Sequence, residues 1–315
     1  MSDQKWTEAD IPDQSGRKAI VTGANSGLGL VTARELARRG ASVTLAVRDT
    51  ERGEQAATAI REAEPAAQVR VVALDLADLD SIRAFAEARE DIGLDLLVNN
   101  AGVMALPRRT TKDGFEMQLG ANHLGHFALT GLLMPALQKG DEPRVVTLSS
   151  PAHRMGKMNF DDLQGERRYF RWSAYGQSKL ANLLFAFELQ RRASAAGLEL
   201  KSMAAHPGYA ATNLQTRGSG GDGGLLTKLE DGVMAVGNKL LAQSAEMGAL
   251  PTLYAATVKD LPGGSYIGPD GVGEQRGHPH PVDSTSASKD QADARRLWEV
   301  SEQLTGVSFD LATAR

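Results

Sequence analysis

The fold is decided by residues 18–29, which read KAIVTGANSGLG. The apolar run 18–22 predicts a short buried strand, and a helix-like segment follows the glycines to about Arg39. Glycines let the backbone approach a pyrophosphate, and the start of a helix offers free N–H groups and a positive dipole end. The spacing is Gly-x-x-x-Gly-x-Gly, whereas the commoner fingerprint is Gly-x-Gly-x-x-Gly. Strand, glycine turn and helix in this order nevertheless predict a dinucleotide-binding site.

Strands and helices alternate along the rest of the chain. Further strands are expected at residues 42–46, 69–74, 95–99, 144–148, 199–205 and 264–268, and a closing helix is expected at 288–304. Such alternation implies right-handed crossovers and a parallel sheet, so we expect a doubly wound, Rossmann-type, three-layer α/β/α fold. No internal repeat or domain break is visible. We therefore expect an N-terminal extension at 1–16 and a single dinucleotide-binding catalytic domain at 17–315.

Composition narrows the class of protein. Of the 315 residues 23% are charged and the net charge is -4, so the chain has no footprint of nucleic-acid binding. There are no cysteines for disulfides or thiol chemistry, and the scattered histidines do not predict a metal site. No stretch approaches the ~18 apolar residues of a membrane span. Residues 1–16 are polar and lack the apolar core of a signal peptide, so we expect a cytoplasmic protein.

The end of the second strand bears on the choice of cofactor. An NAD site usually carries an acid there for the ribose 2′-hydroxyl, but Val47 occupies our best estimate of that position and Arg48 follows it. A guanidinium suits a 2′-phosphate, so we expect NADP, with NAD as the less favoured alternative. Asp49 either repels that phosphate or caps the helix beginning near Thr50.

The carboxyl ends of parallel strands meet at one edge of a sheet, where ligands of this fold class sit. Gly23, Arg48, Asp75 and Asn99 all fall at such ends. The Asp75 carboxylate either accepts a hydrogen bond from an adenine amino group or caps the next helix. We therefore expect the ligand at this edge.

Tyr175 and Lys179 lie four residues apart and share one helix face. A free phenol titrates near pH ~10, and a neighbouring ammonium favours the phenolate and lowers that value. The pair is then a proton donor and acceptor near working pH, or else an ordinary surface pair.

Asn122 at a helix start costs free energy unless its amide is used. Ser149 and Ser150 end the fifth strand, where a hydroxyl either binds a substrate carbonyl or caps a turn.

Four motifs in this order resemble the short-chain dehydrogenase/reductase family. They are TGANSGLG at 22–29, NNAG at 99–102, Ser150, and Tyr175 with Lys179. Three further stretches look like the retinol dehydrogenase branch and its bacterial relatives, namely NHLGHF at 122–127, SSPAH at 149–153 and QSKLAN at 177–182. The likeness covers about residues 17–213 and implies the same doubly wound fold.

The resemblance implies a catalytic tetrad of Asn122, Ser150, Tyr175 and Lys179. Tyr175 would transfer the proton, and Ser150, the second serine of its pair, would hold the carbonyl or alcohol oxygen. Lys179 would lower the pKa of the tyrosine and hold the nicotinamide ribose. Asn122 would position a water that relays protons.

The resemblance also implies which residues bind the cofactor, and it implies no metal. The set is Gly23, Asn25, Ser26, Gly27, Leu28, Gly29, Arg48, Asp75, Leu76, Asn99, Ala101, Gly102, Tyr175, Lys179, Pro207, Gly208 and Thr212. The Pro207–Gly208 turn would pass the nicotinamide. Thr212 would bind the carboxamide or the phosphates.

Two segments depart from the smallest members of the family. Residues 151–172 form a polar insertion, expected over one side of the site and usual in the retinol dehydrogenase branch. Glycines at 218–224 followed by an amphipathic helix predict a substrate lid at about 213–243, or else a helix packed permanently on the body. Eukaryotic members of the branch often carry an apolar N-terminal anchor, which residues 1–16 do not resemble. The chain could form a homodimer or homotetramer.

We therefore expect an NADP-dependent short-chain dehydrogenase/reductase that interconverts an alcohol and a carbonyl in a small-molecule substrate. The nicotinamide carries the hydride, and the protein supplies orientation and proton transfer. One alternative is reduction of an activated C=C bond, as in protochlorophyllide reductase, which shares these motifs. Another is a non-catalytic NADP-binding sensor, which would not need the Tyr175/Lys179 pair. The sequence names neither the substrate nor the direction of reaction.

Overall fold

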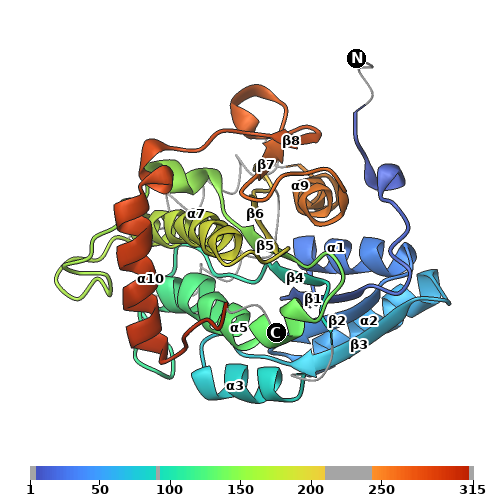
Figure 1. The fold of residues 1–315 in the computed structure, drawn as a ribbon, viewed down its shortest axis with the longest axis horizontal. Helices are drawn as coiled ribbons and strands as arrows, with labels where there is room; N and C mark the ends of the chain where they lie inside the picture. Colours follow the sequence, from blue (N-terminus) through green and yellow to red (C-terminus); the bar gives the residue numbers. More distant parts are fainter. Residues whose placement is uncertain (1–4, 90–92, 210–242, 312–315) are drawn as a thin grey trace, which may run out of the picture.

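An eight-stranded sheet runs through the described residues of the computed structural model, which are 5–89, 93–209 and 243–311 (Figure 1). The strands are β1 (Lys18–Thr22), β2 (Ser42–Val47), β3 (Gln68–Ala73), β4 (Leu96–Asn99), β5 (Arg144–Leu148), β6 (Lys201–Ala205), β7 (Tyr266–Pro269) and β8 (Pro279–Pro281). Their order is β3-β2-β1-β4-β5-β6-β7-β8. All neighbours are parallel except β7 and β8, which are antiparallel. The expected doubly wound sheet is confirmed, with one antiparallel edge strand added.

The strand order reverses at β1, which lies between β2 and β4. From β1 the chain builds outward to β3 and then returns to build β4 to β8 on the other side. In open α/β sheets the ligand binds in the crevice outside the carboxyl ends of the strands at such a reversal. The glycine-rich turn follows β1 directly, so the fold carries it to this crevice.

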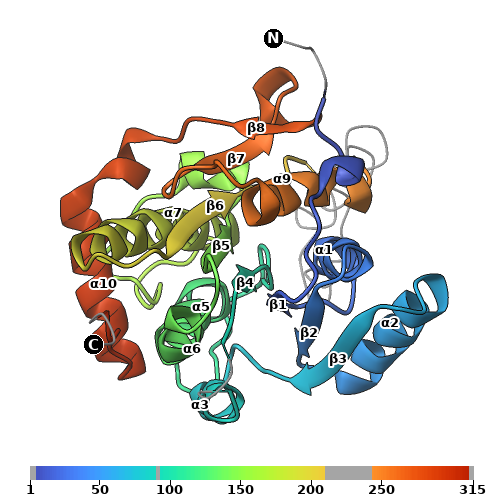
Figure 2. The same ribbon diagram turned by 45° about the vertical axis from the view of Figure 1, so that its right-hand side comes forward.

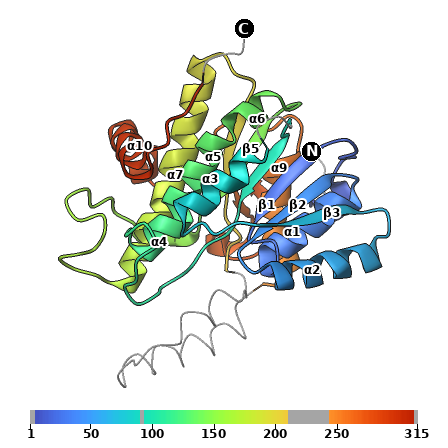
Figure 3. The same cartoon turned by 90° about the horizontal axis from the view of Figure 1, so that it is seen from below.

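Helices cover both faces of the sheet (Figures 2 and 3). They are α1 (Gly27–Arg38), α2 (Thr50–Ala63), α3 (Leu79–Glu87), α4 (Met117–Leu119), α5 (Gly125–Leu132), α6 (Met134–Gln138), α7 (Arg171–Ala195), α9 (Ala245–Thr257) and α10 (Gln291–Thr305). Ala19 and Val21 of β1 pack in one core with α1, α2 and α9, while Ile20 packs in another with α3, α5 and α7. This alternation is what two covered faces require.

Side-chain caps fix where several helices begin. Asp49 accepts a hydrogen bond from the Arg52 N–H at 3.1 Å and is the N-cap of α2. Of the two alternatives for Asp49, repelling a phosphate or capping the helix, the structure therefore shows the cap. Asp75 does not cap α3, because Asp78 does so; Asp75 instead accepts from the Ala77 N–H two residues on, at 3.0 Å. Both carboxylates stabilise free N–H groups near strand ends.

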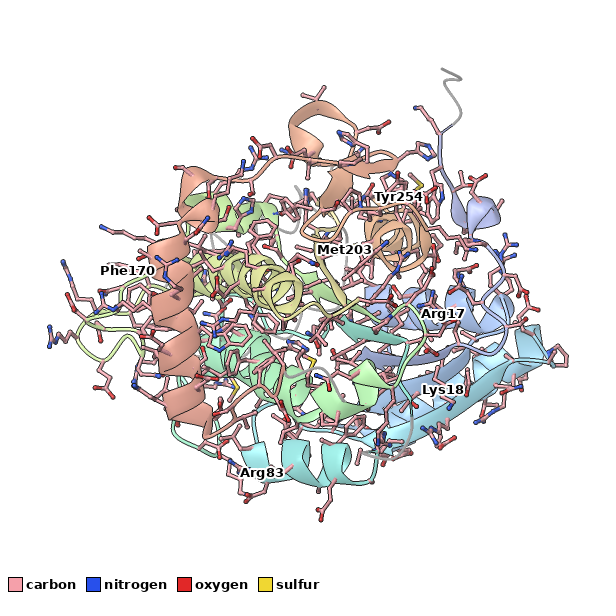
Figure 4. All side chains as sticks on the ribbon, viewed as in Figure 1. Arg17, Lys18, Arg83, Phe170, Met203 and Tyr254 are labelled. Atoms are coloured by element: carbon pink, nitrogen blue, oxygen red, sulfur yellow. The ribbon has the colours of Figure 1, made fainter. Side chains whose placement is uncertain are left out.

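Side chains divide clearly between interior and surface. Met203 of β6 lies fully buried in the core between the sheet and α9, whereas Phe170 is 67% exposed at the outer side of the molecule (Figure 4). Among the described residues, none of the helices is both long enough and apolar enough to cross a bilayer.

Candidate active site

The glycine turn is crowded in a way that only glycine permits. Gly23 has φ +66°, and a Cβ on it would lie 3.0 Å from the Ala101 Cβ. A Cβ on Gly29 would lie 2.6 Å from the Gly23 carbonyl oxygen and 2.4 Å from Asn100 Nδ2. Ser26, the N-cap of α1, makes no side-chain cap. The first N–H groups of α1 therefore face the turn without that cap, as an anion-binding helix start requires.

The threonine that ends β1 ties this turn to the end of β4. Thr22 Oγ1 accepts hydrogen bonds from the N–H groups of Asn100 and Ala101, both at 2.9 Å. Asn100 Nδ2 donates to the Thr22 carbonyl at 2.7 Å. The side chain of Asn99 points elsewhere, into the interior, where it donates to Thr130 Oγ1 at 3.1 Å. Only the backbone of Asn99 is therefore left for a cofactor.

The side chain of Asn122 is fully buried and fully used. It lies in a π-helical turn, Gly120–Leu124, a conformation frequent at functional sites. Its Oδ1 accepts from the Val103 N–H at 2.7 Å, and its Nδ2 donates to the Val103 carbonyl and to Ser178 Oγ, both at 2.9 Å. A Cβ on Gly102 would lie 3.0 Å from Asn122 Oδ1 and 3.6 Å from Lys179 Nζ. Asn122 thus fastens the loop after β4 to α7 beside the lysine.

Ser150, Tyr175 and Lys179 meet behind this loop. The side chain of Tyr175 interacts with that of Ser150, and Lys179 Nζ lies 5.7 Å from the centre of the tyrosine ring. Lys179 Nζ also donates to the Leu148 carbonyl at 3.2 Å. Ser149 Oγ is turned away and donates to the Lys179 carbonyl at 2.9 Å. Of the two serines, Ser150 is the one directed at the tyrosine.

Burial is the main cause of the shifted pKa values of Tyr175 and Lys179. It raises the pKa of Tyr175 to about 12, and the hydrogen bond with Ser150 offsets this only in part. Burial also lowers the pKa of Lys179 to about 8. The sequence had predicted a lowered pKa for the tyrosine, and the structure shows the opposite direction. The reason is that desolvation penalises the phenolate, while the ammonium contacts the ring and the Leu148 carbonyl.

The end of β2 presents its last residues differently. Val47 is 1% exposed and packs in the core with α1, α2 and α9. A Cβ on Gly53 would lie 2.7 Å from Val47 Cγ2. Arg48, one residue later, is exposed at the strand end. Asp49 is engaged by α2 and by Arg52, 3.4 Å away. Arg48 is therefore the group at this end that is open to a phosphate.

The predicted insertion at 151–172 packs on the start of α7. Its first part is a 3₁₀ turn, Pro151–Met155, that begins at Ser150. A Cβ on Gly156 would lie 2.4 Å from the Gly176 carbonyl, so the two backbones touch beside the tyrosine. Farther along, the Tyr169 hydroxyl donates to the Leu106 carbonyl at 2.9 Å. The insertion is therefore anchored at both ends, at its first end beside Tyr175.

The turn after β6 lies next to Ser149, whose N–H donates to the Ala205 carbonyl at 2.8 Å. Gly208 has φ +63°, and its N–H donates to His206 Nδ1 at 3.2 Å. The expected contributions of Thr212 and of a lid at about 213–243 fall outside the described residues, apart from Gln243. Within the described ranges no three metal-ligating side chains gather closely enough to hold an ion.

Sequence reasoning missed two residues of this region, His206 and Glu274. His206 directly precedes the Pro207–Gly208 turn, but a lone histidine beside a turn is a weak signal. Glu274 lies 68 residues away in sequence, and only folding brings it within hydrogen-bonding distance of His206.

Comparisons with known proteins agree with this geometry. The family model for short chain dehydrogenase matches residues 17–220. Retinol dehydrogenase 12 of Mus musculus is 42% identical over 311 residues, covering 96% of this chain and 90% of that protein. Retinol dehydrogenase 13 of Homo sapiens is 43% identical over 306 residues, covering 96% and 87%. Polyprenol dehydrogenase of Mus musculus is 41% identical over 304 residues, covering 94% and 86%.

Solved structures give the same result. A crystal structure of an uncharacterized protein from Mycobacterium paratuberculosis is 49% identical, with a TM-score of 0.81, and the match covers 98% of this chain and 100% of that one. A structure from Beutenbergia cavernae with bound NADP is 25% identical, with a TM-score of 0.59 and coverage of 78% and 91%. The chain belongs to the short-chain dehydrogenase/reductase family, in its retinol dehydrogenase-like branch, and is an NAD(P)-dependent oxidoreductase.

Proposed function

We propose that this enzyme uses NADP to interconvert an apolar alcohol and its carbonyl, with Tyr175 as the proton-transferring residue. The observation that carries the proposal is the buried contact of Tyr175 with Ser150, with Lys179 beneath the ring and the glycine turn at the same edge of the sheet. Such a group can hold a substrate oxygen and exchange a proton with it.

The described residues fit a dinucleotide. The α1 start suits a pyrophosphate, because the glycine turn leaves no room for side chains and Ser26 leaves the N–H groups uncapped. Asp75 would accept from the adenine, Lys179 would bind the nicotinamide ribose, and the Pro207–Gly208 turn would face the nicotinamide. When bound, the nicotinamide supplies or accepts the hydride.

NADP is preferred in this proposal because of Arg48. Its exposed guanidinium stands at the end of β2, and the nearest acid, Asp49, is occupied as the cap of α2. A charge-assisted contact to a 2′-phosphate would then distinguish NADP from NAD. The inward-facing Val47 offers no carboxylate for the NAD ribose.

The proton chemistry follows from the ionisation of the site. With a pKa of about 12, Tyr175 holds its proton at neutral pH and can donate it to a carbonyl oxygen that Ser150 binds. In the reverse direction the phenolate form of the tyrosine takes the proton from the alcohol. Lys179, with a pKa of about 8, is mainly charged at pH 7 and can bind ribose hydroxyls. The protonated phenol is the form that carbonyl reduction requires.

The substrate class is suggested by two features. Relatives of this chain are named for retinol and polyprenol, which are long apolar alcohols. In this chain the Trp172 ring lies edge-on to Tyr175, with 6.3 Å between ring centres, and adds an apolar surface next to the reacting group. We therefore place long-chain and isoprenoid aldehydes first among candidate substrates.

The test is NADPH oxidation against a panel of carbonyls that includes retinal, isoprenoid aldehydes, small ketones and activated enones. Steady turnover of aldehydes, with the alcohol as product, supports the proposal. Reduction of only the enone C=C bond would contradict it and identify a C=C reductase. Tight NADPH binding without turnover of any compound would indicate a sensor.

A further inference from the structure

Three charged or titratable side chains from distant segments form a chain of hydrogen bonds behind Ser150. His206 Nε2 lies 3.1 Å from Glu274 Oε2, and Arg154 Nη2 lies 2.7 Å from Glu274 Oε1. The His206 side chain is fully buried, and that of Glu274 is 21% exposed. These three residues, which we call the carboxylate clamp, have no part in the proton chemistry described above.

The hydrogen bonds define the tautomer of His206. Its Nδ1 accepts from the Gly208 N–H, so the proton of the neutral ring is on Nε2 and is donated to Glu274. Burial lowers the pKa of His206, which keeps the ring neutral at neutral pH. The bond from His206, with help from Arg154, holds the pKa of Glu274 at about 2, so its carboxylate is ionised. Both ring nitrogens of His206 and both carboxylate oxygens of Glu274 therefore have a defined partner.

Close packing surrounds the imidazole. A Cβ on Gly268 of β7 would lie 2.1 Å from His206 Nε2, so the ring occupies the space that a side chain there would need. The ring of Tyr266 stands between His153 and His206, with centres 5.7 and 5.1 Å apart. The ring of His206 therefore has little freedom to turn.

The loop between β7 and β8, which contains Glu274, also contacts the backbone of the Pro207–Gly208 turn. The Tyr209 N–H donates to the Gln275 carbonyl at 2.9 Å, and a Cβ on Gly208 would lie 2.5 Å from that oxygen. Gln243 Nε2 donates to the Pro207 carbonyl at 2.6 Å. Glu274 itself has φ +57°, a conformation uncommon for a residue other than glycine. The carboxylate is thus presented from a tightly constrained loop.

The clamp connects the two segments that border the reacting group. Arg154 lies in the 3₁₀ turn that begins at Ser150, and His206 precedes the Pro207–Gly208 turn. Glu274 comes from the loop between β7 and β8, the two strands that lie beyond β6 at one side of the sheet (Figure 2). Removing the carboxylate would leave the buried Nε2–H of His206 without an acceptor.

We propose that Glu274 is a positioning residue that fixes the Pro207–Gly208 turn relative to Ser150 and thereby sets how tightly the nicotinamide half of the cofactor is bound. The inference rests on the proposed function only for the identity of that cofactor. It predicts that the clamp acts on one half of the dinucleotide and leaves the adenine half unaffected.

The experiment compares binding of two probes to the full chain by calorimetry. NADPH contains both halves of the cofactor, whereas adenosine 2′,5′-bisphosphate contains only the adenine half. The variants are Glu274→Ala, Glu274→Gln and Arg154→Ala. Glu188→Ala is the matched control, because Glu188 is likewise a carboxylate held by two basic side chains, Arg191 and Arg192, but it lies on α7 beyond Lys179. Hydrogen exchange of the peptide that contains Gly208 gives a readout without any ligand.

For Glu274→Ala we expect roughly tenfold weaker NADPH binding, unchanged bisphosphate binding, and faster exchange at Gly208. Glu274→Gln should recover most of the affinity, since its amide oxygen still accepts from His206. Arg154→Ala should show a smaller loss, because the His206–Glu274 bond remains. Glu188→Ala should change neither probe.

Equal weakening of both probes by Glu274→Ala, or no weakening of either together with unchanged exchange at Gly208, would overturn the proposal. Failure of the wild type to bind NADPH would instead refute the cofactor assignment, and the exchange at Gly208 would still decide the role of Glu274. If Glu274→Ala does not fold, Glu274→Gln and Arg154→Ala must show the graded loss, and the absence of any loss in both would refute the role.

Discussion

The two sides of the sheet build their parts of the site by different means. On the β1 and β4 side the site is made mainly of backbone, with glycines packed against Ala101 and Asn100 and a helix start left open. On the β5 to β7 side it is made mainly of side chains, including the buried Tyr175, Lys179 and His206. A backbone site tolerates no added atoms, whereas a side-chain site depends on particular functional groups. The following substitutions test this difference.

The largest effect is expected for Tyr175→Phe, which removes one hydroxyl from the side-chain region. Loss of general acid catalysis should lower kcat by roughly 10²–10⁴-fold while NADPH affinity changes little. Steady-state kinetics and calorimetry measure the two quantities. Tyr254→Phe on α9, where the ring packs on Trp6, is the control and should keep wild-type rates. Wild-type turnover by Tyr175→Phe would remove the tyrosine from the mechanism.

Gly23→Ala tests the backbone region. The Cβ would lie 3.0 Å from the Ala101 Cβ, so the turn must shift, and we expect NADPH binding to weaken on the order of a hundredfold. Gly197→Ala is a matched control, because Gly197 has a similar φ of +70° but nothing within 4 Å of its Cβ. That variant should lose about 1 kcal/mol of stability and no affinity. Equal affinity losses in both variants would mean that backbone strain, and not crowding at the site, is responsible.

Arg48→Ala examines the one side chain that the backbone region contributes. Loss of a charge-assisted contact should weaken NADPH by roughly tenfold to a hundredfold and leave NADH unchanged. Values of kcat/KM for the two cofactors decide it, with Arg61→Ala in the last turn of α2 as the control. A wild type that prefers NADH would contradict the proposed preference.

Lys179→Met should affect stability and function in opposite directions. The pKa of Lys179 is lowered to about 8 in the folded protein from an ordinary value of 10.5, so the unfolded chain binds more protons between those values. Stability of the wild type should therefore rise with pH across this window and be reduced below it. The methionine variant should be more stable at pH 7, by ~1–3 kcal/mol, and bind NADPH several-fold more weakly. Thermal unfolding at pH 7 and pH 10 measures the first effect, and a lower melting temperature of the variant at pH 7 would contradict it.

Much of the backbone region could be predicted from the sequence, because glycines and strand patterns lie close together along the chain. The side-chain region could be predicted only in part. The sequence predicts roles for Tyr175, Lys179 and Ser150, and the fold brings them together, but the raised pKa of Tyr175 depends on burial that spacing does not reveal. Glu274 was missed because its partner is 68 residues away.

The antiparallel strand β8 was not predicted, since three residues that begin and end in proline do not read as a strand. Proline is tolerated only at sheet edges, and β8 lies at one. Without it, the sheet would end at β7, and the free N–H and C=O groups of β7 could pair with another molecule. Two of the three residues of β8 have no N–H to donate, so an approaching strand finds little to bind. This edge should therefore resist aggregation when the protein is concentrated.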